Sequence, residues 1–370
     1  MENTAVRVYV QSPKWFIRPR NTDWRYTRFM IPRIHEFAPE CSFYAANSNS
    51  TLFHANRRYL RLLAGRKLHL NIRPDHNSVL DRREFARSHC DLVFCHDDFP
   101  SNAESIPVVW QNSILDPAMV KARGASENAL AAEYARKRIG FEKARFVQVS
   151  TQAEAVRLSA WFPQIADKFV AIPFFLPDVQ PISSESLEEK VKRTGVLRCL
   201  FVGHEAKRKG LARVYDAFSG LPHDIQNRVH LTVVSSQTDG RIPAPALPNL
   251  KVSDALPHEQ VQRLIRESDV LLMPSLFESY GLVYLEAMAQ GTIPVVPDWE
   301  VQRELVDYGK AGIIFKSDPV EISQALQSLY NDIDLRRHLA FNARERFEQH
   351  FAPSVVAKKL SSMFQQAVQT

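Results

Sequence analysis

One continuous stretch, Glu267 to Pro297, constrains the fold more than any other part of the sequence. Within it, Val270 to Met273 is an apolar run of strand length that ends at a proline. A helical pattern follows from Leu282 to Gln290, a glycine stands where it can cap the helix, and Ile293 to Val296 is a second buried strand. Two strands joined by a helix over so short a stretch form a βαβ unit. The sequence therefore predicts a parallel sheet around this segment.

The loop that leads into this predicted helix combines backbone donors with carboxylates. The first N–H groups of a helix have no partner inside it and lie at the positive end of its dipole, so they suit an anion such as a diphosphate. Here those groups belong to Tyr280, Gly281, Leu282 and Val283. Glu278 stands in the loop, at the carboxyl end of a strand, and Glu286 follows inside the helix. This arrangement suits a nucleotide sugar, which carries phosphates and hydroxyls; the alternative is that both glutamates are solvated.

From Pro274 to Val296 the chain reads P-S-L-F-E-S-Y-G-L-V-Y-L-E-A-M-A-Q-G-T-I-P-V-V. This segment resembles the donor-site signature of retaining glycosyltransferases of the family-four type, whose central mark is a Glu-x7-Glu pair, matched here by Glu278 and Glu286. The resemblance implies the GT-B architecture, in which two Rossmann-like α/β domains with parallel sheets face each other across a cleft and the last helix crosses back to the first domain. It also implies sugar transfer from a nucleotide sugar, with no obligatory cofactor and no metal.

Length and composition are compatible with two such domains. The chain has 370 residues, 45% of them hydrophobic and 24% charged, which is typical of globular proteins. The stretch from Pro173 to Ser186 holds three prolines and ends in polar residues, as interdomain linkers do. We therefore expect an acceptor-side domain over residues 1–178, a donor-binding domain over 179–352 and a returning helix over 353–370.

A basic turn in the second half is a further candidate phosphate site. Gly203 follows a predicted strand, and the turn continues through several basic residues to Lys209 before a predicted helix, which is a phosphate-binding arrangement. The family pattern at this place is Gly-Arg, five residues, then Lys-Gly, whereas four residues separate His204 from Lys209 in this chain. His204 stands where the family usually has arginine, and an imidazole is neither permanently charged nor able to fork to two oxygens. Lys209 is therefore the principal candidate for the diphosphate, with Arg208 as compensation.

The resemblance assigns roles to further residues. Glu286 is implied to hold the ribose hydroxyls, and Glu278 to contact the donor sugar and stabilise an oxocarbenium-like transition state. A histidine commonly follows the strand that matches Asp91–Cys95 and projects towards the sugar; His96 stands there, although a lone histidine after a strand is more often a polar loop residue. The implied catalytic residues are Glu278, Lys209 and His96. The implied donor-binding residues are Gly203, His204, Arg208, Lys209, Lys251, Val252, Ser279, Tyr280, Gly281, Leu282, Val283 and Glu286.

The first half departs from the family pattern after its first strand, Val6 to Val10. The family usually has a glycine-rich loop here, whereas this chain has Q-S-P-K-W-F-I-R-P-R-N-T-D-W-R and no glycine before Gly65. The aromatic and basic loop Trp15–Arg25 suits a stacked glycan, an anionic acceptor or a membrane interface, or is a partly buried loop with solvated arginines. Further elements predicted in this half are helices over Tyr26–Phe37, Leu52–Ala64 and Ser126–Gly140 and a strand over Leu68–Ile72.

Partners and location follow from what the sequence lacks. No run approaches the roughly 18 apolar residues of a membrane span, and Met1 to Val10 has no signal-peptide pattern, so we expect a cytoplasmic protein. Peripheral contact with the anionic inner face of a membrane stays open. The expected partners are a UDP-, GDP- or other nucleotide-sugar donor and a glycan or lipid-linked acceptor. Nucleic acid is not expected, because the net charge of +6 is accompanied by no recognition helix or RNA-binding signature.

Two other classes of function remain open at this point. One is another GT-B enzyme, such as a nucleotide-sugar epimerase or a phosphorylase, because fold alone does not fix function. The Glu-x7-Glu segment favours transfer over epimerisation. The other is a protein without strong catalysis, either a catalytically weak partner subunit or a basic nucleic-acid-binding protein. His204 and the missing glycine loop are the features that favour it.

Overall fold

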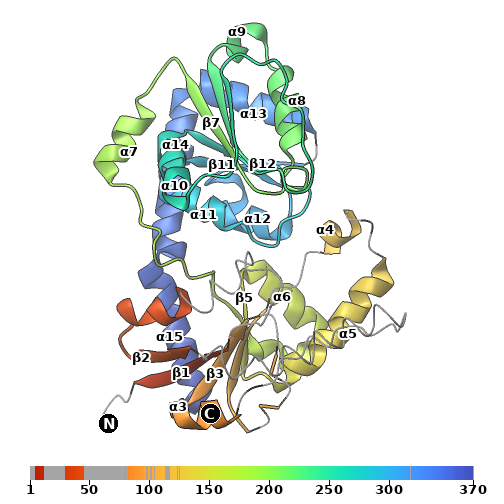
Figure 1. Ribbon diagram of the computed structural model, residues 1–370, viewed down its shortest axis with the longest axis vertical. Coiled ribbons are helices and arrows are strands. Elements are labelled where there is room, and N and C mark those ends of the chain that lie inside the picture. Colours follow the sequence, from red (N-terminus) through yellow and green to blue (C-terminus); the bar gives the residue numbers. More distant parts are fainter. Residues whose placement is uncertain are drawn as a thin grey trace. The chain divides into compact units, whose positions relative to one another are not determined.

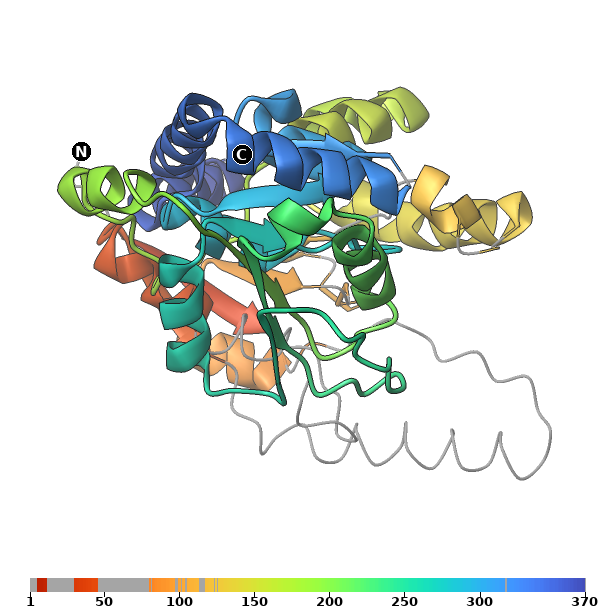
Figure 2. The same ribbon diagram turned by 90° about the horizontal axis from the view of Figure 1, so that it is seen from above.

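The computed structural model describes most of the chain, and its helices and strands can be followed in Figure 1 and Figure 2. The described residues are 5–11, 30–45, 80, 82–96, 99–100, 102–103, 105–112, 117–122, 124, 126–316 and 318–369. The predicted loop Trp15–Arg25, helix Leu52–Ala64 and strand Leu68–Ile72 lie outside them. Contacts divide the chain into a first unit of Met1–Ser113, Ala131–Pro177 and Pro353–Thr370 and a second unit of Ile114–Leu130 and Asp178–Ala352.

A six-stranded parallel sheet forms the centre of the first unit. Its strands are β1 (Val6–Gln11), β2 (Cys41–Ala45), β3 (Leu92–His96), β4 (Val108–Gln111), β5 (Phe146–Val149) and β6 (Phe169–Ala171). They lie in the order β2-β1-β3-β4-β5-β6. The strands β1, β3 and β4 are almost wholly buried, as is usual for the inner strands of a parallel sheet that is covered on both faces. Because the strand order reverses between β1 and β3, the switch point of this sheet lies between those two strands.

Helices cover both faces of the first sheet. On one face Phe364 meets Phe94 with ring centroids 5.7 Å apart, and on the other Phe141 meets Trp110 at 5.2 Å. The last helix of the chain packs on β1, β3 and β4 of this unit, as expected for a returning helix. The helical elements are the 3-10 segments η2 (Ile31–Glu36) and η4 (Pro163–Lys168) and the helices α3 (Arg82–Ser88), α5 (Glu127–Lys143), α6 (Gln152–Trp161) and α15 (Pro353–Gln369).

Two helix predictions in the first half need correction. Over its described part, the helix predicted for Tyr26–Phe37 is the short 3-10 helix η2, because the chain must turn again before β2 and leaves room only for a brief connector. The helix predicted to end at Gly140 continues to Lys143. A Cβ atom at Gly140 would lie 2.5 Å from the ring of Trp110. This glycine therefore allows α5 to approach the sheet closely and does not end the helix.

The second unit contains another six-stranded parallel sheet. Its strands are β7 (Leu197–Val202), β8 (Val229–Val234), β9 (Leu250–Ser253), β10 (Val270–Leu272), β11 (Ile293–Pro297) and β12 (Ile313–Phe315). The order is β12-β11-β10-β7-β8-β9, which is the Rossmann order with its switch point between β7 and β10. The predicted βαβ unit is confirmed, because β10 pairs in parallel with β11.

The helices of the second unit lie before, between or after the strands of its sheet along the chain, and one of them belongs to the segment Ile114–Leu130. Gly291 follows α11 with a φ of +59° and donates its N–H to Met288 at 3.0 Å, so it is the C-terminal cap that the sequence predicted. None of the helices described in the chain has the length and hydropathy needed to span a membrane. The elements are α4 (Pro117–Ala122), α7 (Ser184–Val191), α8 (Leu211–Ser219), α9 (His223–Gln226), α10 (His258–Glu267), α11 (Leu282–Ala289), α12 (Glu300–Leu305), η5 (Asp307–Gly309), α13 (Pro319–Asn331), α14 (Ile333–Arg346) and the π-helical η6 (Phe347–Phe351).

One boundary in the second half also differs from prediction. The predicted linker, Pro173–Ser186, overlaps the first residues of α7. Ser183 caps that helix by accepting a hydrogen bond from the N–H of Ser186 at 3.2 Å. The linker is therefore shorter than the proline pattern indicated.

A buried lysine joins α7 to the end of α11. The Nζ atom of Lys190 donates hydrogen bonds to the carbonyl of Gln290 at 2.9 Å and to Oγ1 of Thr292 at 2.7 Å. Burial disfavours the charged amine and lowers the pKa of Lys190 to about 7. The amine is thus held by two neutral oxygens, an arrangement that an uncharged amine satisfies without a counter-ion.

The lowered pKa of Lys190 predicts a pH-dependent contribution to stability. Between pH 7 and the ordinary lysine pKa of 10.5, the unfolded chain binds a proton that the folded chain has released, so the free energy of unfolding rises with pH. Below pH 7 the folded chain also binds this proton, and the full cost of burying the charged amine lowers its stability. We expect the free energy of unfolding of Lys190→Met, measured relative to that of the wild type, to be highest near pH 7. This difference should decrease by up to about 4 kcal/mol towards pH 10. Urea unfolding of both proteins across this range measures the difference, and a difference independent of pH would contradict the assignment.

Candidate functional site

Two loops meet at the carboxyl edge of the second sheet, at its switch point. β7 and β10 are adjacent and parallel, with Leu200 opposite Leu271, so the chain leaves both strands at the same edge. The loop after β7 is the basic turn 203–210, and the loop after β10 leads to α11. The N–H of Leu276 in the second loop donates to the carbonyl of Arg208 in the first at 2.8 Å. Two motifs that lie far apart in the sequence are therefore joined through their backbones.

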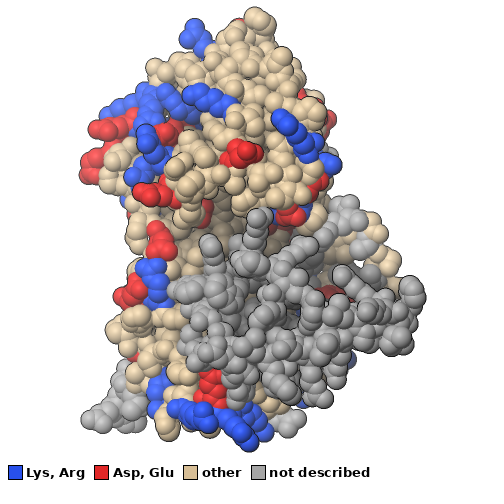
Figure 3. Space-filling model, in the orientation of Figure 1, with Lys and Arg blue, Asp and Glu red and all other residues tan. Residues whose placement is uncertain are grey.

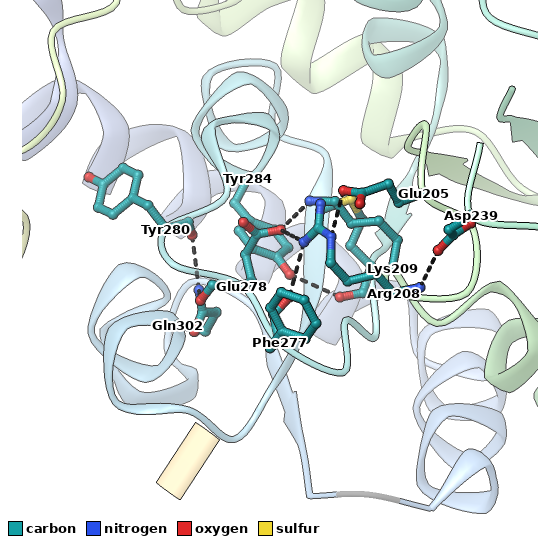
Figure 4. A network of polar contacts seen from close by, with 10 residues as sticks. Glu205, Arg208, Lys209, Asp239, Phe277, Glu278, Tyr280, Tyr284 and Gln302 are labelled. Carbon is teal, nitrogen blue, oxygen red and sulfur yellow. Dashed lines mark hydrogen bonds and ion pairs between the residues drawn. The ribbon is translucent and has the colours of Figure 1, made fainter. Parts of the chain in front are cut away.

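Glu278 lies at the centre of this junction (Figure 4). Its side chain is 9% exposed and forms ion pairs with Nζ of Lys209 and, at 3.5 Å, with Nη1 of Arg208. The same guanidinium donates to the carbonyl of Phe277 at 3.1 Å and to Glu205 at 2.7 Å. A buried carboxylate is stable only when it is paired, so the two cations hold Glu278 in place. Three residues that the sequence predicted separately thus form one charge cluster.

Asp239 supports the basic turn, and the sequence analysis missed it. Its carboxylate accepts hydrogen bonds from the backbone N–H of Lys207 at 3.2 Å and of Arg208 at 2.8 Å. The bonds fix the path of the backbone just before Lys209 (Figure 4). An Asp-Gly pair after β8 is a turn signal, but the sequence does not show that the turn reaches across to the loop of a neighbouring strand.

Gln302 on α12 supports the other loop and was also missed. It is fully buried, and its Nε2 donates to the carbonyl of Glu278 at 3.3 Å and to that of Tyr280 at 2.9 Å. From inside the βαβ unit, the hydroxyl of Tyr284 donates to the carbonyl of Met273 at 2.9 Å. Burial raises the pKa of Tyr284 well above its usual value, so the hydroxyl remains a donor. These bonds fix both ends of the loop that carries Glu278.

The start of α11 presents backbone donors beside this cluster, as the sequence predicted. Gly281 is the N-cap with a φ of +91°, and Tyr284 donates its N–H back to the carbonyl of Gly281 at 2.9 Å. Among the described residues, the N–H groups of Gly281, Leu282 and Val283 have no acceptor. Ser279, two residues before Gly281, is exposed. Unpaired N–H groups at the positive end of a helix dipole are suited to bind an anion.

Glu286 lies one turn into α11 and is half-buried. Burial raises the pKa of Glu286 above its usual range, while the charge of His258 and a hydrogen bond with Gln262, both on α10, act in the opposite direction. The sequence assigned Glu286 to this helix but did not identify the two α10 residues that flank it.

Other predicted site residues, both donor-binding and catalytic, are not part of the charge cluster. His204 is exposed, and its Nδ1 lies 2.9 Å from Oγ of Ser236. Lys251 and Val252 are exposed on the edge strand β9 and pair with residues of β8 before that strand reaches its carboxyl end. His96 belongs to the first unit, where it is the last residue of β3 and is 6% exposed. Their assignments stay predictions.

Two glycines allow the basic turn to pass close to its neighbours. A Cβ at Gly203 would lie 2.9 Å from Cγ of Lys209, so the lysine side chain packs directly over this glycine. Gly210 has a φ of +81°, and a Cβ there would lie 2.1 Å from the carbonyl oxygen of Pro274. Since Pro274 belongs to the loop after β10, the absence of a side chain at Gly210 lets the two loops meet.

Comparison with known families gives a match over part of the chain. Residues 183–346 match the family model described as glycosyl transferases group 1. An uncharacterized glycosyltransferase of Methanocaldococcus jannaschii is 26% identical over 264 residues, which cover 68% of this chain and 66% of the relative. A D-inositol 3-phosphate glycosyltransferase of Corynebacterium kroppenstedtii is 34% identical over 113 residues, which cover 30% of this chain and 25% of the relative. The matches thus span less than two thirds of the length of these relatives.

Solved structures share the fold over a larger part of the chain. HepE of Anabaena in complex with UDP-glucose superposes with a TM-score of 0.60 at 14% identity, covering 97% of this chain and 99% of that one. A sucrose-phosphate synthase from Thermosynechococcus elongatus gives a TM-score of 0.57 at 19% identity, covering 77% and 75%. With its two parallel α/β units, the chain has the GT-B fold that the sequence predicted.

The close approach at Gly210 predicts a loss of stability that a matched glycine should not show. Gly195 has a similar φ of +78°, but a Cβ there would meet nothing within 4 Å. We expect Gly195→Ala to cost about 1–2 kcal/mol from backbone strain alone, and Gly210→Ala to cost a further 1–3 kcal/mol because the carbonyl of Pro274 must move. Urea unfolding measures both losses. Equal losses would show that the contact between the two loops is not tight.

Proposed function

We propose, on the premise that residues 183–346 form a group 1 glycosyltransferase domain, that the whole chain moves a sugar from a nucleotide sugar to an acceptor hydroxyl. The observation that supports it most is the cluster of Glu278, Lys209 and Arg208 at a switch point, beside unpaired N–H groups at the start of α11. Cations and backbone donors suit the diphosphate of such a donor, and carboxylates suit its hydroxyls.

The reaction needs negative charge to be stabilised where it develops. The bond between the anomeric carbon and the diphosphate oxygen breaks, the acceptor oxygen bonds to that carbon, and the acceptor proton passes to the departing diphosphate. Lys209, Arg208 and the N–H groups of Gly281 to Val283 would stabilise the departing charge, which is the basis for proposing a reaction without an obligatory metal. Attack on the face that the diphosphate leaves would retain the anomeric configuration.

The remaining predicted residues have roles on the sugar and the nucleoside. Glu278 would contact the donor sugar and stabilise positive charge at the anomeric carbon, and Glu286 would hold the ribose hydroxyls. His96 would steady the sugar or the acceptor. In the charge cluster Glu278 already neutralises Lys209 and Arg208, so a bound diphosphate would have to replace its carboxylate at these cations. We propose that this exchange turns Glu278 towards the sugar.

The acceptor that we propose is a glycan or a lipid-linked glycan, reached from the cytoplasm with peripheral membrane contact left open. A nucleotide-sugar epimerase of the same fold is the alternative enzyme. Incubation with nucleotide sugars and no acceptor distinguishes the two, since only an epimerase would invert the configuration at a carbon of the sugar. For nucleic acid we find no support in the described residues. Basic and acidic side chains of the second unit lie interspersed on the face shown in Figure 3. Ion pairs such as Arg337–Glu188 and Arg263–Glu267 also neutralise basic side chains of this unit.

The first functional prediction concerns rate. We expect Lys209→Ala and Glu278→Ala each to lower the rate of sugar transfer by about 10²- to 10³-fold, the usual effect of removing one electrostatic contact to a transition state. Lys207→Ala is the matched control, because Lys207 is exposed in the same turn and only its backbone N–H bonds to Asp239. Radiolabelled transfer and donor hydrolysis measure the rates, with thermal unfolding to verify folding. Full activity of both site variants would remove the proposal.

The second functional prediction concerns ligand binding, in which Glu278 and Lys209 should have opposite effects. UDP, GDP, ADP and TDP are tested, and the matching nucleotide should raise the unfolding temperature, with about 2.7 kcal/mol of stabilisation at 100 times its dissociation constant. We expect Glu278→Gln to increase this shift, because the diphosphate no longer competes with a carboxylate for Lys209 and Arg208. Lys209→Ala should decrease it. Shifts that change in the same direction in both variants would exclude the exchange of partners.

A further inference from the structure

The carboxyl edge of the first sheet ends in a row of uncharged polar side chains. His96 ends β3, Gln111 ends β4 and is its register partner, and Gln148 of β5 is the register partner of Gln111. Register partners in a sheet point to the same face, so the three side chains lie side by side. His96 adjoins the switch point between β1 and β3, which is the position where open parallel sheets bind ligands.

Within this row, Gln111 holds the imidazole of His96. Nδ1 of His96 lies 2.9 Å from Oε1 of Gln111, and the two side chains are 6% and 3% exposed. A carboxamide oxygen can only accept a hydrogen bond, so Nδ1 is the nitrogen that carries the proton in the neutral ring. Nε2 is then an acceptor. The pairing thus sets the chemical character of both ring nitrogens.

The ring is also held from a second side by the segment that leads into the linker. Phe174 contacts the ring of His96 edge-on, with centroids 6.1 Å apart. Gln148 fixes that segment, because its Nε2 donates to the carbonyls of Ile172 at 2.9 Å and Pro173 at 3.3 Å. Packing and hydrogen bonding therefore restrict the ring separately: Phe174 limits its position and Gln111 its protonation.

We propose that Gln111 is a positioning residue for sugar transfer, which keeps His96 in the tautomer protonated on Nδ1 so that Nε2 accepts a hydrogen bond from a sugar hydroxyl. The inference rests on the proposed function, which gives His96 its contact with the sugar. It specifies a neutral acceptor at this position and excludes a charged imidazolium as the working form. A sugar hydroxyl is the matching group, because it can donate to Nε2 without bringing a charge.

The inference is tested first without any activity measurement. Nitrogen NMR of the histidine rings, with His96→Asn to assign the signal, shows which nitrogen carries the proton at a pH where the ring is neutral. We expect the Nδ1-protonated form in the wild type and in Gln111→Glu, whose carboxylate also accepts. In Gln111→Met, which has no acceptor at this position, we expect a mixture of tautomers. A wild-type ring protonated on Nε2 would overturn the inference.

Gln148→Met is the matched control, because it removes a buried amide from the neighbouring strand without touching the bond between His96 and Gln111. It should leave the tautomer of His96 unchanged, although the protein loses stability and Phe174 can shift against the ring. If it altered the tautomer as much as Gln111→Met does, packing and not Gln111 would set the tautomer, and the inference would fail.

A kinetic measurement connects the tautomer to the reaction. We expect kcat/KM for transfer to fall about three- to tenfold in Gln111→Met, the effect of weakening one hydrogen bond. In Gln111→Glu the carboxylate favours the charged imidazolium, whose Nε2 cannot accept, so kcat/KM should fall at low pH and return towards the wild-type value at a pH where the ring is neutral. Equal losses in both variants at that higher pH would contradict a positioning role. If the wild type itself transfers no sugar, the proposed function fails while the NMR result still decides whether Gln111 sets the tautomer.

Discussion

The ion pairs of one buried carboxylate hold the second unit's site together. Glu278 is almost inaccessible to water, so its charge requires the two cations of the basic turn. Glu278 lies in the loop after β10, whereas Lys209 and Arg208 lie in the turn after β7. Separating such a pair typically costs about 3–5 kcal/mol, because it leaves a buried charge without compensation. Glu205 adds a second carboxylate on Arg208 and balances the cluster. The two loops are therefore mutually dependent, and an anion that binds there must replace charges that are already matched.

Backbone contacts give this cluster a rigid support. Gly210 lets the basic turn lie against the carbonyl of Pro274, Asp239 fixes the turn from the side of β8, and Gln302 fixes the carbonyls around Glu278 from α12. These contacts fix the backbone of both loops, so that the exchange of partners proposed above moves the side chain of Glu278 and leaves the backbone in place. Preorganised donors and cations stabilise developing charge more than mobile ones do.

The two sheets share a parallel doubly wound plan but end in different side chains at their switch points. The second presents cations, carboxylates and open N–H groups, whereas the first presents the amides of Gln111 and Gln148 beside His96. Charged groups match phosphates, and neutral donors and acceptors match sugar hydroxyls. In the proposed function the second unit would therefore hold the leaving diphosphate and the first would orient a hydroxyl.

The sequence by itself determined the elements and the motifs that act locally. The strand-helix-strand unit around Glu278, the cap at Gly291 and the basic turn up to Lys209 were predictable, because hydrophobic period, helix capping and glycine placement depend on neighbours along the chain. Only the tertiary structure decided that Glu278 pairs with Lys209 and Arg208, that Asp239 and Gln302 hold the loops, and that Gly140 packs against Trp110. Those contacts depend on which strands become adjacent and on which side chains burial forces into pairs, and neither has a signature in local sequence.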